Sequence, residues 1–261
     1  MEGPDRDPPT PPLTALRIAS RLTALVGWLL LCVAGHGTWR LFRLPSPWPH
    51  RFLGGVAWIC GVRARWSGPP PRGRVLLVAN HCSWLDIMVI GGATGAAFLG
   101  KAELASVPLV GWLCRLNRTV FVDRASRAAI PQQIADTRRA LEAGPVAIFP
   151  EGTTSDGVTL LPFKPALFQA LDPPPPCVIV QPLFLDYGPA AAEIAWTEAL
   201  GESGAANGLR VLGRPGVIPV TVHLLEAIDP AATGDRKAVS AEARRRIASA
   251  IERTGSPMRV A

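Results

Sequence analysis

His81 and Asp86 are the two residues of this sequence whose types and spacing best suit chemistry. They follow the apolar run 75–79, which has the character of a buried strand, and ligands in α/β proteins collect outside the carboxyl ends of strands. On a regular helix a five-residue offset would place the two side chains about 140° apart. They can therefore meet only if His81 lies in a turn and Asp86 on the first turns of a following helix, with Ser83 as its N-cap.

The chemistry that such a pair supports is general-base catalysis. An imidazole that a carboxylate holds through one ring nitrogen can take a proton from a hydroxyl group through the other. Asp86 is also the first acidic residue after Asp7, and it stands among apolar residues, where an unpaired carboxylate is unfavourable. The spacing alone leaves open the alternative of a structural core histidine with a carboxylate partner.

Two further segments carry groups that suit an anionic ligand. Residues 149–157 follow a strand-like run and contain two glycines and three hydroxyl side chains. Such a turn offers backbone N–H groups to a phosphate, although a capped surface turn has the same composition. Residues 118–124 have the pattern of a strand that ends in Arg124, which could clamp a phosphate; a surface ion pair with Asp123 is the alternative.

Thiol and metal chemistry are weakly supported. Cys82 adjoins His81, but adjacent side chains do not generally face each other, and no second base is evident. The four histidines are scattered and form no metal-binding motif. The five cysteines lack CxxC spacing, which is typical of buried free thiols in a reducing compartment. We therefore expect no bound metal.

The composition is that of a globular chain in contact with a membrane. Hydrophobic residues make up 48% and charged residues 18% of the 261 residues, which excludes a disordered chain. Residues 8–85 carry nine arginines, no lysine and no acid, which suits anionic lipid head groups or phosphates. Nucleic acid is disfavoured, because tryptophan and leucine runs interleave with these arginines where a DNA-binding arm would be polar.

The N-terminal quarter predicts a membrane anchor. Residues 1–12 are polar and proline-rich and are expected to be a disordered tail, without the features of a cleavable signal peptide. Within 13–67, Leu22–Trp39 has 18 residues without a formal charge and would form a helix about 27 Å long, close to the hydrocarbon thickness of a bilayer. Phe52–Val62 is a second apolar piece, too short to span. We expect a two-helix anchor that spans the bilayer once or dips into it; two core helices of a soluble protein are the alternative.

Residues 68–261 predict one α/β domain. Apolar runs of strand character alternate with segments of helical periodicity, which favours a mainly parallel central sheet flanked by helices. The expected strands are 74–79, 97–99, 119–122, 146–149, 178–183 and 219–224, and the expected helices are 84–90, 102–116, 127–142, 165–171 and 237–253. In the last helix one face is apolar and is expected to meet the core, namely Val239, Ala243, Ile247, Ala250 and Ile251.

Five blocks of the chain resemble the ordered motifs of the glycerolipid acyltransferase family, to which the lysophosphatidic acid acyltransferases belong. The blocks are Asn80–Asp86, Lys101–Leu104, Val120–Arg124, Phe149–Thr153 and Val180–Pro182. The resemblance implies a glycerol-phosphate acyltransferase-like α/β fold. It also implies transfer of a fatty acyl group from acyl-CoA or acyl carrier protein to the hydroxyl of a lysophospholipid, without a metal or a cofactor.

The same resemblance implies roles for individual residues. His81 would deprotonate the acceptor hydroxyl, with Asp86 orienting it and stabilising its charge. Contacts to the acceptor's phosphate are implied for two cations, Lys101 and Arg124. Three residues would shape the acceptor pocket: Glu151, Gly152 and Thr153. Further candidates are Asn80, Arg118 and Thr154.

Two departures from the family's pattern bear on the acceptor. The block around Glu151 commonly reads Glu-Gly-Thr-Arg-Ser, and this chain has Thr154 at the arginine position; a glycine is common where this chain has Arg118. Lysophosphatidic acid is the first expected acceptor. Lyso-ornithine lipid is the alternative, since the run 118–124 is also similar to the related lyso-ornithine lipid acyltransferases. An alternative of another class is a non-catalytic lipid-binding or scaffold protein on the same fold.

The expected partners follow from this activity. They are the bilayer, a lipid acceptor within it, and acyl-CoA or acyl carrier protein as the co-substrate; nucleic acid is not expected. The expected location is the cytoplasmic face of the inner (cell) membrane, where the N-terminal region would hold the enzyme.

Overall fold

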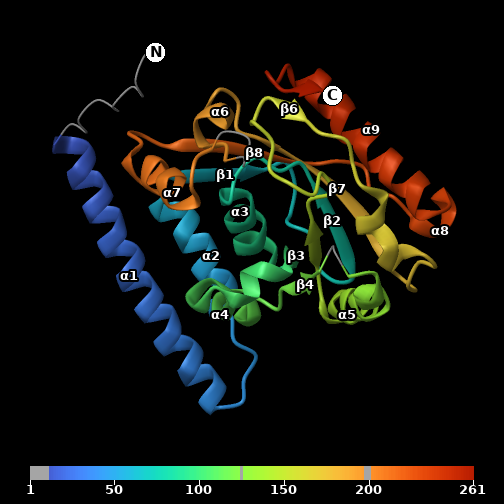
Figure 1. Cartoon of the computed structure of the whole chain (residues 1–261), viewed down its shortest axis with the longest axis horizontal. Helices are drawn as coiled ribbons and strands as arrows, with labels where there is room; N and C mark the ends of the chain where they lie inside the picture. Colours follow the sequence, from blue (N-terminus) through green and yellow to red (C-terminus); the bar gives the residue numbers. More distant parts are fainter. Residues whose placement is uncertain (1–11, 124–125, 197–200) are drawn as a thin grey trace.

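The computed structural model describes residues 12–123, 126–196 and 201–261. Within these residues a seven-stranded sheet has the order β1-β8-β7-β2-β5-β3-β4 (Figure 1). Its strands are β1 (Val62–Trp66), β2 (Val75–Ala79), β3 (Ala97–Lys101), β4 (Val120–Val122), β5 (Val146–Ile148), β7 (Ile179–Asp186) and β8 (Ile218–Leu224). Neighbouring strands are parallel except β7 with β8, which confirms the predicted mainly parallel sheet. The short strands β6 (Thr159–Leu160) and β9 (Arg259–Val260) pair separately.

The strand β2 lies inside the sheet, between β7 and β5, because its sequence is apolar on both sides. Val75, Leu77 and Ala79 join the core on one face of the sheet, and Leu76 and Val78 join the core on the other. A continuous apolar run is what a parallel strand covered on both faces requires. The carboxyl end of β2 therefore emerges from the middle of the sheet, where it delivers the chain to the turn that contains His81.

Helices cover both faces of the sheet (Figure 1). On one face lie α2 (Trp48–Ile59) and α3 (Leu85–Thr94). On the other lie α5 (Ile130–Ala143), α9 (Arg236–Thr254) and the 3-10 helix η3 (Pro165–Leu171). The predicted core face of α9 is confirmed, since all five of its residues are buried. The remaining helices are α1 (Pro12–Leu41), η1 (Ala102–Ser106), α4 (Pro108–Leu116), η2 (Arg127–Ala129), α6 (Ala190–Ile194), α7 (Gly204–Gly213) and α8 (Pro230–Thr233).

The edge strand β1 lies within the range 13–67 that the sequence assigned to the anchor. It pairs in parallel with β8 from Val62 opposite Ile218 to Trp66 opposite Val222. The sheet therefore begins before residue 68. The two arginines of this strand are exposed, which is usual at the edge of a sheet. Because they resemble the basic residues of the predicted anchor, the sequence did not indicate a strand here.

The helix α1 meets the domain through close contacts with α2. A Cβ atom on Gly55 would lie 2.1 Å from Nε1 of Trp28, and one on Gly35 would lie 2.2 Å from the ring of Trp48. Each helix thus inserts an indole against a glycine of the other. A Cβ on Gly92 of α3 would in turn lie 2.6 Å from the backbone of α2. The three helices are stacked at distances that side chains at these glycines would prevent.

The first turns of α1 are tied to α7. Arg17 donates a hydrogen bond to the carbonyl of Gly213 at 2.6 Å, and Arg21 donates to the carbonyls of Leu212 and Arg214 at 2.9 and 3.0 Å. Carbonyls at the C-terminus of a helix have no partners within it, and guanidinium groups satisfy them well. These two arginines therefore fix α1 to the domain, in addition to any contact with lipid.

Most of α1 is exposed and apolar. The helix has 30 residues and is about 45 Å long; its most apolar 18-residue window has a mean hydropathy of 1.8, and only 6% of that window is buried. By length and composition α1 can cross a membrane. Its low burial argues against a core helix of a soluble protein. In contrast, α2 is 12 residues long and lies between α1 and α3.

Candidate active site

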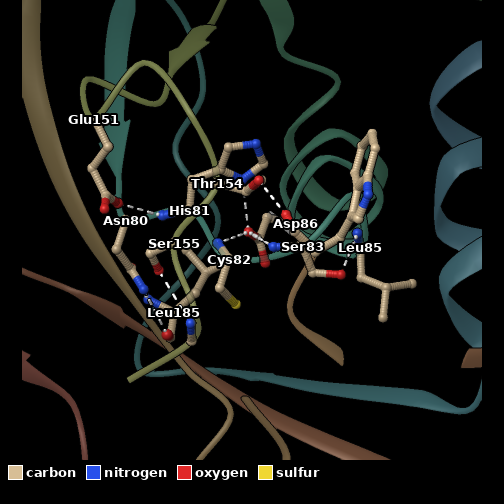
Figure 2. A network of polar contacts seen from close by, with 12 residues as sticks. Asn80, His81, Cys82, Ser83, Leu85, Asp86, Glu151, Thr154, Ser155 and Leu185 are labelled. Atoms are coloured by element: carbon tan, nitrogen blue, oxygen red, sulfur yellow. Dashed lines mark hydrogen bonds and ion pairs between the residues drawn. The ribbon is translucent and has the colours of Figure 1, made fainter. Parts of the chain in front are cut away.

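His81 and Asp86 meet at the carboxyl end of β2. His81 lies in the turn after the strand, and Asp86 lies in the first turn of α3. Nδ1 of the imidazole is 2.8 Å from Oδ2 of the carboxylate (Figure 2). The arrangement is the one that the five-residue spacing requires. The prediction of Ser83 as the N-cap is wrong: Trp84 holds the cap position, without a side-chain hydrogen bond.

Asp86 is buried, and four donors satisfy its carboxylate. Oδ2 accepts hydrogen bonds from the backbone N–H groups of Cys82 and Ser83 at 2.8 and 2.9 Å, in addition to the imidazole. Oδ1 accepts one from the hydroxyl of Tyr187 at 2.8 Å. These bonds offset the unfavourable burial of a carboxylate among apolar groups. The turn preceding α3 is thus wrapped around the side chain of Asp86.

Tyr187 is a site residue that the sequence analysis missed. It follows the carboxyl end of β7, next to β2 in the sheet, and burial raises the pKa of its hydroxyl well above the usual range. A signal was available, because this is the single tyrosine of the chain and it follows a strand. Its contact with Asp86 spans 101 residues of sequence, which local spacing does not reveal.

The imidazole of His81 is held on several sides. Its ring stacks on that of Phe149, with centroids 3.9 Å apart and planes 12° from parallel. Its backbone N–H donates to Oε1 of Glu151 at 2.7 Å, and its carbonyl accepts from the N–H of Ser155 at 2.8 Å. With Nδ1 directed at Asp86, Nε2 is the ring nitrogen left for a substrate. The side chain is 14% exposed and contributes to the wall of a cavity.

The cavity beside His81 has a volume of about 940 Å³ and a mostly apolar wall. It is large enough for a lipid chain or a comparable ligand. The wall comes from α1, α2, α3 and α4 together with the ends of β3 and β5. His81 is one of the few polar side chains in this wall.

Glu151 is buried and holds the turns of the site together. Oε1 accepts from the N–H of His81 and Oε2 accepts from the N–H of Leu161 at 2.9 Å (Figure 2 shows the first bond). Burial raises the pKa of this carboxyl to about 8, although the two backbone hydrogen bonds act in the opposite direction. Both oxygens are thus engaged by backbone, so Glu151 shapes the site by positioning His81.

This raised pKa predicts a pH-dependent stability. Between the ordinary glutamate pKa of 4.5 and the folded value of about 8, the native state binds more protons than the unfolded state. Stability therefore falls as pH rises through that window, by up to about 1.4 kcal/mol per pH unit. In Glu151→Gln this contribution disappears, and one of the two N–H groups loses its acceptor, a loss of about 1–3 kcal/mol. Denaturant unfolding in detergent at pH 5 and pH 8 measures both effects; equal pH dependence in the two proteins would contradict the prediction.

The residues after Glu151 line the cavity. Gly152, Thr153 and Thr154 all contribute to its wall. Gly152 has a φ of +74°, which favours glycine, and a Cβ there would lie 2.8 Å from Nζ of Lys164. The hydroxyl of Thr154 donates to the carbonyl of Trp196. Thr154 is therefore engaged with the backbone and contributes no positive charge.

Asn80 ties two strands together at the site. It is buried, its Nδ2 donates to the carbonyl of Leu185 at 3.1 Å, and its Oδ1 accepts from the N–H of Leu185 at 2.8 Å. This pair of bonds joins the carboxyl end of β2 to β7. Asn80 acts on the position of the next residue, His81.

The candidate cations lie in different places. Lys101 ends β3 and lines the cavity. Arg118 precedes β4, and its guanidinium donates to the carbonyl of Gly95 at 3.0 Å. Arg118 therefore lies at the amino end of β4, whereas the dyad lies at the carboxyl end of β2. This position does not support a contact between Arg118 and a substrate bound at the dyad. Arg124 lies outside the described residues.

Cys82 does not have the surroundings of a nucleophile. It is buried, and burial raises the pKa of its thiol well above the usual range, with the negative charges of Asp86 and Glu151 acting in the same direction. A thiolate is disfavoured at such a position. Among the described residues, no group of three or more histidine, cysteine, aspartate or glutamate side chains could hold a metal ion.

The sequence is similar to those of known acyltransferases. Residues 65–183 match the acyltransferase family. The lyso-ornithine lipid O-acyltransferase of Rhizobium meliloti is 36% identical over 216 residues, which cover 76% of this chain and 70% of that protein. That of Brucella abortus is 34% identical over 80% of this chain and 82% of its own length. The 1-acyl-sn-glycerol-3-phosphate acyltransferase of Neisseria meningitidis is 43% identical over 111 residues, 42% of this chain and 44% of that protein.

A solved structure shows the same fold. The 1-acyl-sn-glycerophosphate acyltransferase PlsC of Thermotoga maritima aligns over 92% of this chain and 98% of its own, with a TM-score of 0.56 and 21% identity. The sequence identity to the two lyso-ornithine lipid O-acyltransferases, over most of their length, shows membership of the same family as well as a shared fold. The chain therefore belongs to the acyltransferase family that includes the lyso-ornithine lipid O-acyltransferases and the 1-acyl-sn-glycerol-3-phosphate acyltransferases, and it is an acyltransferase.

Proposed function

We propose that this enzyme transfers a fatty acyl group from acyl-CoA or acyl carrier protein to the hydroxyl of a membrane lysophospholipid, with His81 as the general base. The observation that carries the proposal is His81 in the wall of a large apolar cavity, held by the buried carboxylate of Asp86. An apolar space next to a base suits a lipid substrate whose hydroxyl must lose a proton.

The hydrogen bonds around Asp86 assign the proton on the imidazole. Oδ2 already accepts from two backbone N–H groups, so Nδ1 of His81 is the donor in the third bond. In the neutral ring Nε2 then carries the lone pair. The base is thus held in the tautomer that can accept a proton from a substrate.

The reaction steps follow from this tautomer. The acceptor hydroxyl donates to Nε2, and its oxygen attacks the carbonyl carbon of the thioester as Nε2 takes the proton. Asp86 stabilises the resulting imidazolium. When the tetrahedral intermediate collapses, the C–S bond breaks and the imidazolium returns the proton to the leaving sulfur. An ester and a thiol are formed, and the steps use no metal and no cofactor.

The acceptor is proposed from the residues near the dyad. Lys101 and Gly152–Thr153 would receive the head group, and Arg124 would join them. Lysophosphatidic acid is the first candidate. Lyso-ornithine lipid is the second, and one observation favours it: the relatives with that activity match a larger part of this chain than the 1-acyl-sn-glycerol-3-phosphate acyltransferases do. Thr154, which stands where an arginine is common in the family, bonds to the carbonyl of Trp196 and supplies no cation for a phosphate.

An acceptor panel tests the function and the head group together. Purified full-length enzyme in lipid receives acyl-CoA with lysophosphatidic acid or lyso-ornithine lipid of the same acyl chain, and thiol release is measured over time. We expect release that depends on an acceptor hydroxyl. The ratio of the two kcat/KM values assigns the acceptor. Thiol release that is independent of every acceptor would overturn the proposed transfer.

We also propose that the catalytic domain lies on the cytoplasmic face of the inner membrane. Both proposed acyl donors are cytoplasmic molecules, and α1 supplies a helix long and apolar enough for the membrane. Cys177 is exposed, so labelling of its thiol shows on which side of the membrane the catalytic domain lies. A membrane-impermeant maleimide should label it only after the membrane is opened; labelling in intact spheroplasts would place the domain outside.

A further inference from the structure

A second apolar surface lies outside the predicted anchor, on η1 and α4. Its large side chains are between 38% and 54% exposed. We call it the α4 face: Leu104, Val107, Leu109, Val110 and Trp112. No charged residue lies between Glu103 and Arg115. A helix in water normally turns its apolar residues toward the core, and a contiguous exposed set of this kind marks an interaction surface.

The α4 face and α1 lie at the same cavity. Both helices line the same cavity, α1 through Leu29 and Val33 and α4 through Val110 and Trp112. Figure 1 shows α4 beside the C-terminal half of α1. A helix that can cross a membrane and an exposed apolar helix thus border one opening. Lipid around the exposed part of α1 would therefore also lie close to α4.

The charges and size of this segment suit the interfacial region of a bilayer. With nine residues, α4 is too short to span. The cation Arg115 stands in its last turn, where the guanidinium donates to the carbonyl of Ala105 and lies 5.9 Å from the ring centre of Phe121. Trp112 provides the indole that favours the boundary between head groups and acyl chains. An apolar face with a basic edge is the pattern of a helix that lies in the membrane surface.

We propose that the α4 face inserts into the interfacial region of the bilayer as a second membrane contact, and that lipid enters the cavity between α1 and α4. The occupant of the α4 face is a lipid leaflet. The contact is separate from the N-terminal anchor, and it does not depend on the identity of the acceptor. It would hold the cavity open toward the bilayer, so that a lysolipid reaches the dyad without crossing water.

Depth measurements test the contact directly. A polarity-sensitive dye is attached at Val107→Cys in the full-length protein, in a Cys114→Ala, Cys177→Ser background, because these two native thiols are the more accessible ones. The control carries the dye at Ala241→Cys on α9, which packs on the other face of the sheet. With phosphatidylethanolamine–phosphatidylglycerol vesicles, we expect a blue shift and quenching by spin-labelled lipid only at position 107. Equal quenching at both positions, or none at position 107, overturns the proposal.

Activity measurements separate this contact from the cavity. Val107 and Leu109 belong to the α4 face, and their side chains are not among those that line the cavity of the described chain. In Val107→Glu/Leu109→Glu we expect about tenfold slower acylation of lysolipid in vesicles, since charge replaces two inserted apolar side chains. Acylation of a short-chain lysolipid below its critical micelle concentration should change by less than about twofold, because that substrate arrives from water.

A matched variant controls for added charge. Ile179→Glu/Val260→Glu places two carboxylates at exposed apolar positions outside the α4 face and is expected to keep the vesicle activity. An equal loss in this control would show that negative charge alone slows the enzyme. An equal loss with the monomeric short-chain substrate would show that the α4 variant acts on the cavity or the fold. Either result overturns the proposal. A loss of activity with acyl carrier protein as the donor, but not with acyl-CoA, would instead indicate that this face binds the carrier protein, and it would also overturn the proposal.

Discussion

Replacing His81 with alanine is expected to lower kcat about 10²–10⁴-fold and to lower stability by about 1–3 kcal/mol, because the buried carboxylate of Asp86 loses one donor. The variant removes Nε2, the group proposed to take the acceptor's proton, which corresponds to about 2.7–5.5 kcal/mol of transition-state stabilisation. The turn itself should persist, because Glu151 and Ser155 bind the backbone of residue 81 rather than its ring. Thiol release from acyl-CoA with a saturating acceptor measures the effect, and thermal unfolding reports on the fold.

A second histidine of the chain provides the matched control. His223 also stacks on a phenylalanine, Phe184, with ring centroids 5.6 Å apart, but it lies on β8. His223→Ala removes an imidazole–phenyl contact of the same kind without touching the dyad. We expect it to keep nearly full activity. If His81→Ala is folded and keeps its activity, His81 is not the base. The His81–Asp86 pair would then have a structural role only.

The central features of the fold and the dyad could be predicted from local sequence. The run 75–79 is apolar at every position, which only a strand covered on both faces needs. The spacing of His81 and Asp86 excluded a shared helix and required a turn, as found. The face of α9 followed from its period alone. Each of these inferences rests on residues that are close in sequence.

The parts that could not be predicted depend on distant contacts. The bonds of Arg17 and Arg21 to α7 bridge more than 190 residues, so a local pattern of arginines and leucines indicated only lipid. Glu151 looked like a wall of the acceptor pocket, but its two oxygens face backbone N–H groups from separate segments. Arg118 was a candidate from the family resemblance, but the parallel pairing of β4 with β3 places it at the amino end of these strands, away from the dyad. To place these side chains, one must know the order and direction of the strands in the sheet, which local sequence does not give.

Asp86→Asn is expected to keep the architecture of the turn and still lower kcat about 10²-fold or more. An amide oxygen in the place of Oδ2 can accept from the same three donors, and the amide NH₂ can then donate to the oxygen of Tyr187. The reversed amide is excluded, because its NH₂ would face the N–H groups of Cys82 and Ser83. The tautomer of His81 is therefore preserved, and what is lost is the negative charge that stabilises the imidazolium.

Tyr187→Phe separates this charge from the hydrogen-bond network around it. It removes the donor to Oδ1 and leaves the carboxylate, so we expect a severalfold loss in kcat, with KM unchanged, and a stability loss of about 1–3 kcal/mol for the buried acceptor left unsatisfied. Asp86→Asn removes the negative charge and keeps the hydrogen bonds, whereas Tyr187→Phe removes one hydrogen bond and keeps the charge, so the two kcat values separate these contributions. Equal kcat values in the wild type and in Asp86→Asn would mean that Asp86 only shapes the turn. The order of the losses, largest for His81→Ala, then Asp86→Asn, then Tyr187→Phe, follows the distance of each group from the transferred proton.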